Sequence, residues 1–109
     1  MPERKNVENL FLETIEWIRG KLEPLRIPYM ITGGSAVGFW GHIRTTMDID
    51  MVLQMPANRL DAFLESVGKD AYVDIQTAKE AVLQKSMFNI ILNETLFKVD
   101  IVLLDENND

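Results

Sequence analysis

The segment that decides the fold runs from Met47 to Gln54 and reads MDIDMVLQ. It is apolar except for Asp48, Asp50 and its last residue, and Pro56 follows closely, which predicts a buried strand that ends before the proline. Side chains at positions i and i+2 of a strand point to the same face, about 7 Å apart. Two carboxylates beside a core repel each other and are costly to desolvate. This face of the strand must therefore open to water or hold a cation.

A third carboxylate occupies a similar setting near the end of the chain. Residues 96–104 are apolar except for Lys98 and Asp100, which predicts another strand. If the two strands are neighbours, three carboxylates converge. The chain has no cysteine and only one histidine, and three acids without nitrogen or sulfur ligands suit Mg²⁺ or Mn²⁺ rather than Zn²⁺.

A glycine pair precedes this segment. Residues 29–32 predict a short strand, Gly33 and Gly34 predict a turn, and Ser35 stands at the start of a short helix expected over residues 35–40. Glycines allow backbone N–H groups to approach an anion closely, and a helix N-terminus favours negative charge. A phosphate-binding loop beside a metal site supplies the parts that phosphoryl or nucleotidyl transfer requires.

The rest of the chain completes a single domain. Its pattern predicts helices over residues 6–23, 57–67 and 77–85, and strands over 71–74, 87–92 and 95–104, with a hairpin at Asn93-Glu94. We find no internal repeat or linker in the 109 residues, and we expect the acidic tail 105–109 to fray. The fold class is therefore α/β (α+β), with two layers: a mixed β-sheet and helices packed on one face.

Composition limits the classes of function. Apolar residues make up 47% and charged residues 26%, as in an ordinary globular domain. The net charge of -6 leaves nucleic acid only a local patch, a metal or a partner through which to bind. The longest uncharged stretch, residues 27–43, is too short and too rich in glycine to span a bilayer, and no address signal precedes it. Cytoplasm is the expected location, with no membrane partner.

Each feature also has a plainer interpretation. The glycine pair with Ser35 can be a capped turn, the two aspartates can be a wet sheet edge, and the methionines can be core filler. The glycine spacing resembles a P-loop, but Phe39-Trp40 stands where Lys-Ser/Thr is required. Only the combination of glycines and acids favours a catalytic site.

The combined pattern resembles the DNA polymerase β-like nucleotidyltransferase superfamily. Its signature is a Gly-Gly or Gly-Ser pair, about a dozen residues, an Asp-apolar-Asp/Glu-apolar run, and a third acid on a later strand. Here thirteen residues separate Gly34 from the run Asp48-Ile49-Asp50-Met51, and Asp100 matches the third acid. The stretch 33–37 with the run 44–50 looks most like the bacterial AbiEii-like and minimal nucleotidyltransferase branch.

The resemblance implies a role for each site residue. The three acids, Asp48, Asp50 and Asp100, would be catalytic and would hold Mg²⁺ or Mn²⁺, and Asp100 would also take the proton of the acceptor hydroxyl. The nucleotide and phosphate contacts would come from Gly33, Gly34, Ser35, Arg44, Thr46 and Lys98.

The implied activity is transfer of a nucleoside monophosphate from an NTP to a hydroxyl of a protein, an RNA or a small molecule. A toxin–antitoxin role would add a partner protein, the antitoxin or the toxin. Many members of the superfamily continue into a helical domain, so this nucleotidyltransferase core is either a minimal form or a fragment. Two alternatives remain open: a non-catalytic nucleotide- or protein-binding module of the same fold, and a metal-dependent nuclease, in which the glycine pair would have no evident role.

Overall fold

The computed structural model describes residues 7–37 and 46–105. The elements in these residues are α1 (Val7–Leu22), a 3-10 turn η1 (Glu23–Leu25), β1 (Tyr29–Val37), β2 (Thr46–Leu53), α2 (Ala57–Val67), β3 (Ala71–Tyr72), α3 (Ile75–Gln84), β4 (Met87–Leu92) and β5 (Lys98–Leu103). No helix within these residues is long and apolar enough to cross a membrane.

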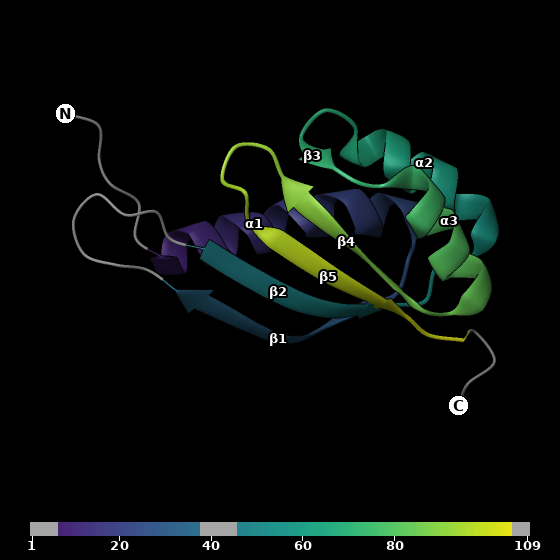
Figure 1. Ribbon diagram of the computed structural model, residues 1–109, viewed down its shortest axis with the longest axis horizontal. Helices are drawn as coiled ribbons and strands as arrows, with labels where there is room; N and C mark the ends of the chain where they lie inside the picture. The colour runs from purple at the N-terminus through teal and green to yellow at the C-terminus, as the bar shows by residue number, and fades with distance from the viewer. Residues whose placement is uncertain (1–6, 38–45, 106–109) are drawn as a thin grey trace.

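The strands form one mixed sheet in the order β1-β2-β5-β4-β3. Strands β2 and β5 are parallel, and the other neighbouring pairs are antiparallel. Figure 1 looks onto the strands, with α1 crossing behind them. The predicted α+β class with a mixed sheet is confirmed.

Buried and less buried residues alternate along β2 and β5, and this alternation explains the two layers. In β2 the residues at odd positions are buried, whereas Asp48 and Asp50 on the other face retain exposed surface. In β5 the odd positions are again buried, and Lys98, Asp100 and Val102 lie on the less covered face. The helices cover the first face, and the shared core contains Ile18, Leu22, Met47, Ile49, Met51, Leu53, Leu60, Phe63, Val67, Ala78, Ala81, Val82, Phe88, Ile90, Val99, Ile101 and Leu103. We call the other side of the sheet the open face.

The helices follow their predicted ranges closely. Helix α1 ends at Leu22, and the proline-containing turn η1 follows it. Helix α2 occupies residues 57–67 as predicted. Helix α3 begins at Ile75, two residues before the predicted start, because Asp74 caps it: the Asp74 carboxylate accepts a hydrogen bond from the backbone N–H of Thr77 at 3.0 Å.

The prediction of a turn at Gly33-Gly34 is wrong. Strand β1 continues through both glycines to Val37, so the helix expected over residues 35–40 is absent from its first three positions, and residues 38–40 lie outside the described part of the chain. Pairing with β2 overrides the local signal: Gly34 lies opposite Ile49 and Ser35 opposite Asp48. The irregularity takes the form of a bulge, where the register shifts between Ile31 and Gly33.

Smaller differences concern the last strands. Strand β3 has only two residues, and β5 begins at Lys98 rather than at residue 95. The connection from β4 to β5 is longer than the predicted two-residue hairpin. The backbone N–H of Leu92 donates to the carbonyl of Phe97 at 2.8 Å, and Leu96 adopts a φ of 63° inside this loop. Residues 106–109 of the expected frayed tail lie outside the described residues.

Candidate functional site

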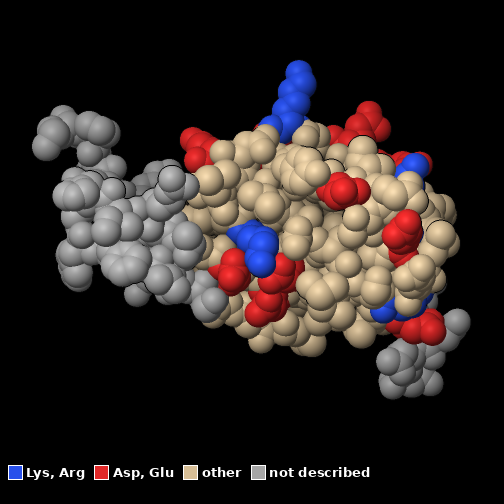
Figure 2. Space-filling model, in the orientation of Figure 1, with Lys and Arg blue, Asp and Glu red and all other residues tan. Residues whose placement is uncertain are grey.

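The open face of β2 and β5 carries the three acids. In the parallel register, Asp50 lies beside Asp100 and Asp48 lies beside Lys98. Neighbouring strands are about 4.8 Å apart, so the Asp50 and Asp100 carboxylates are direct neighbours. Asp48 precedes Asp50 by two residues and points to the same face. Figure 2 shows acidic atoms gathered around one basic side chain on this face, over β2 and β5. The sequence analysis made convergence of the carboxylates conditional on adjacent strands, and β2 and β5 are adjacent.

Asp100 has the most constrained carboxylate of the three. Its Oδ1 is buried and makes no hydrogen bond in the described structure, and the Lys98 Nζ atom is 3.7 Å away. Burial raises the pKa of Asp100 above its ordinary value; Lys98 lowers it, and the charges of Asp50 and Asp48 with a hydrogen bond to Asp50 raise it further. Among the described residues, the three carboxylates therefore carry more negative charge than Lys98 balances.

The two glycines of β1 face opposite sides of the sheet. A Cβ atom at Gly33 would stand 3.4 Å from Oδ2 of Asp50, so Gly33 borders the acids and its missing side chain leaves space there. A Cβ at Gly34 would stand 3.0 Å from the ring of Phe11, so Gly34 borders the helical layer. At the bulge, Thr32 Oγ1 donates a hydrogen bond to the carbonyl of Asp50 at 3.3 Å.

The phosphate-binding arrangement expected at these glycines differs from the structure. Gly33, Gly34 and Ser35 lie in a paired strand, so the donors are not at the start of a helix. Ser35 pairs with Asp48, and Thr46 begins β2 opposite Val37. Arg44 lies outside the described residues. Of the predicted phosphate contacts, the structure places Gly33 and Lys98 beside the acids.

The donor set fits Mg²⁺ or Mn²⁺ in chemistry. Carboxylate oxygens are the ligands that these ions prefer, and the covered Oδ1 of Asp100 has no hydrogen bond. The side chains are not preformed for binding: within residues 7–37 and 46–105, no three His, Cys, Asp or Glu side chains stand close enough together to hold an ion. Binding at this face requires the carboxylates to rotate toward one another.

Sequence reasoning missed one polar neighbour. Asn89 of β4 lies opposite Asp100, on the side away from Asp50, and its side chain is exposed. The sequence could have indicated this residue, because Asn89 is the one polar residue of the otherwise apolar strand β4. The row Gly33, Asp50, Asp100 and Asn89 thus crosses four strands.

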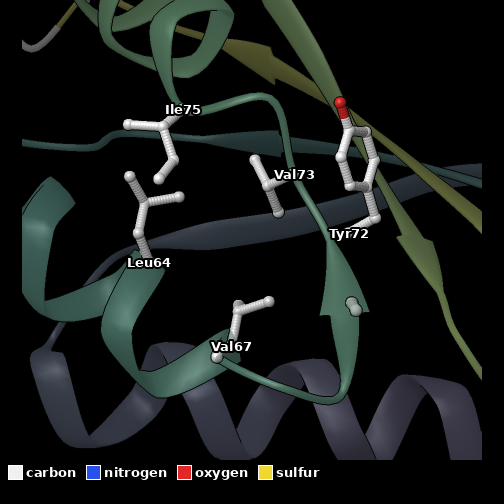
Figure 3. Close-up of a pocket in the computed structure, with 7 residues that line it drawn as sticks. Leu64, Val67, Tyr72, Val73 and Ile75 are labelled. Carbon is white, nitrogen blue, oxygen red and sulfur yellow. The ribbon is translucent and has the colours of Figure 1, made fainter.

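A separate hollow of about 260 Å³ lies between α2 and the start of α3. In Figure 3, Leu64 and Val67 of α2 face Val73 and Ile75 across it. Its lining contains no Asp, Glu, His, Lys or Arg, and Tyr72 supplies its only side-chain hydroxyl group.

Comparison of the chain with protein-family models, with curated proteins and with solved structures found no match.

Proposed function

We propose that this domain is a Mg²⁺-dependent nucleotidyltransferase, which moves a nucleoside monophosphate from an NTP to a hydroxyl acceptor. The observation that carries the proposal is the register of β2 against β5, which sets Asp50 beside Asp100 with Asp48 on the same face. Lys98 Nζ stands 3.7 Å from the buried Oδ1 of Asp100 and balances one of the three carboxylates, and a bound cation would balance the others.

Three carboxylates on one face would hold Mg²⁺ or Mn²⁺, which supplies charge stabilisation to phosphate oxygens when it is bound. Asp48 and Asp50 would bind on the side of the triphosphate, and Asp100 on the side of the acceptor. Gly33 leaves the space beside Asp50 free for a phosphate group, because any side chain there would contact the Asp50 carboxylate. Lys98 is positioned to balance charge on the triphosphate once a cation neutralises Asp100.

The reaction balances with these residues. The acceptor hydroxyl oxygen forms a bond to the α-phosphorus, the bond from that phosphorus to the α–β bridging oxygen breaks, and pyrophosphate leaves with the electron pair. Asp100 takes the hydroxyl proton, since its carboxylate faces the open side of the sheet beside both other acids.

The test uses NTPs labelled at the α-phosphate, with Mg²⁺ or Mn²⁺ and a cell extract as the source of acceptor. The native chain should transfer label, and the Asp48→Asn/Asp50→Asn variant should not. Asp61→Asn, which changes an exposed carboxylate on α2, is the matched control and should transfer label normally. NTP labelled at the γ-phosphate should release labelled pyrophosphate and leave the acceptor unlabelled. Equal labelling by the native chain and the double variant would refute the catalytic proposal.

A second candidate is a non-catalytic nucleotide-binding module of the same fold. The observation that favours it is that, within residues 7–37 and 46–105, the acids do not stand close enough together to form a ready catalytic metal group. This candidate predicts metal-dependent binding of NTP with no transferred label and no pyrophosphate. Equilibrium binding of a fluorescent NTP, measured beside the labelling assay, separates the two candidates.

A further inference from the structure

The open face carries an apolar row next to the acids. Met30, Val52, Val102 and Met87 lie opposite one another across β1, β2, β5 and β4, and we call them the apolar strip. Met30 is 61% exposed, Met87 49% and Val102 42%. Val52 and Val102 are two positions along their strands from Asp50 and Asp100, so the strip is about 7 Å from the carboxylates. An exposed apolar row on a sheet is a candidate contact surface for another molecule.

The strip has the size of a short length of extended chain. Four strands at about 4.8 Å spacing make it about 14 Å long, the span of about four residues of β-strand. A hollow of about 160 Å³ adjoins the strip and is lined by Met30, Val52 and Leu104 together with Pro28, Tyr29, Leu53 and Gln54. A hollow of this size accommodates one aliphatic or aromatic side chain.

Charge decides which kind of molecule fits. Among the lysines and arginines of residues 7–37 and 46–105, only Lys98 belongs to a strand, and Asp100 already neutralises it in part. Nucleic acid requires basic residues that neutralise its phosphates, and this face offers a surplus of acids instead. Anionic lipid is disfavoured for the same reason. A second copy of the chain would bring two sets of acids together. An extended polypeptide with apolar and basic side chains complements both rows.

We propose that the apolar strip binds an extended segment of a partner polypeptide, with one apolar side chain in the adjoining hollow and basic or neutral residues toward the acids. Binding of this segment does not rest on the proposed nucleotidyl transfer.

Methionine methyl groups give a direct readout of binding. In protein labelled with carbon-13 at the methionine methyls, Met30 and Met87 report on the strip, and the buried Met47, Met51 and Met55 serve as internal controls. The titrants are a mixture of short peptides of leucine, phenylalanine, serine, tyrosine and lysine, the same mixture with glutamate in place of lysine, and short single-stranded RNA of random sequence. All titrations contain EDTA and no nucleotide.

The lysine-containing mixture should shift the Met30 and Met87 signals and leave the three buried methionines in place. Val102→Gln should weaken this binding at least about tenfold, since it places an amide at the centre of the strip. Leu83→Gln, at a residue of α3 that is 77% exposed, should leave it unchanged. Absence of shifts with the lysine mixture, equal shifts with the glutamate mixture or RNA, or equal effects of the two variants would overturn the inference. Because EDTA excludes metal, failure here leaves the labelling assay unaffected, and failure of labelling leaves this result intact.

Discussion

Replacement of Asp100 by asparagine tests the charge balance of the site most directly. In the native domain without metal, Oδ1 of Asp100 is buried without a hydrogen bond and two carboxylates stand beside it. This oxygen stands 3.7 Å from Lys98 Nζ but accepts no hydrogen bond, and relief of a buried charged oxygen without a hydrogen bond is worth about 1–3 kcal/mol. The lost ion pair with the partly exposed Lys98 offsets up to about 1 kcal/mol of this. The amide of asparagine can also donate to Asp50.

Asp100→Asn should therefore stabilise the metal-free domain by about 1 kcal/mol, a rise in Tm of about 4–8 °C for a domain of this size. In the native chain, Mg²⁺ at ten times its dissociation constant should add about 1.4 kcal/mol of stability, and the variant should lose most of this increment. Thermal unfolding followed by circular dichroism, in EDTA and in Mg²⁺, measures both effects. Asp61→Asn controls for the removal of one exposed negative charge.

The pH dependence follows from the raised pKa of Asp100. Between the ordinary value of 3.8 and the raised folded value, the folded chain binds more protons than the unfolded chain, so this group lowers stability as the pH rises through that interval. The advantage of Asp100→Asn should be full at neutral pH and should vanish below about pH 3.8, where the acid is protonated in both states. The reasoning is refuted if the variant is less stable than the native chain in EDTA at neutral pH, or if Mg²⁺ stabilises both equally.

Three further substitutions test the description of the sheet and of α3. Gly33→Ala should leave the Tm nearly unchanged but weaken Mg²⁺-dependent labelling, because its methyl group would contact Oδ2 of Asp50 at 3.4 Å; normal labelling would contradict the placement of Gly33. Gly34→Val should destabilise the domain by about 1–3 kcal/mol in urea unfolding, because the valine side chain would clash with the ring of Phe11. Asp74→Ala should cost about 1 kcal/mol through the lost cap of α3, and rescue by Asp74→Ser would confirm the capping role.

The strands and helices were predictable where the hydrophobic period was clear. Apolar residues recur at helical spacing over residues 57–67, which form α2. Asp48 and Asp50 interrupt an apolar strand, and this interruption indicated that one face of the sheet is open. The sequence could state only that the carboxylates converge if β2 and β5 are neighbours, because no local pattern specifies which strands pair. The structure adds the register that sets Asp50 beside Asp100.

The turn predicted at Gly33-Gly34 is absent for a physical reason. Gly33-Gly34 is typical of a turn in isolation, but cross-strand hydrogen bonds with β2 hold both residues extended, and the local irregularity becomes a bulge. The methionines divide as well: Met47, Met51 and Met55 fill the core as predicted, whereas Met30 and Met87 lie exposed on the open face. Composition cannot separate these two groups, because their difference is the face of the strand on which each one lies.

The parallel pairing of β2 with β5 has a consequence for how the domain folds. The two halves of the acidic row come from strands whose paired aspartates are 50 residues apart in the chain (100 − 50), so this contact has a high contact order and closes a long loop. Repulsion between Asp50 and Asp100 then arises only once β5 docks beside β2. A divalent ion present during refolding should speed that final step as well as stabilise its product.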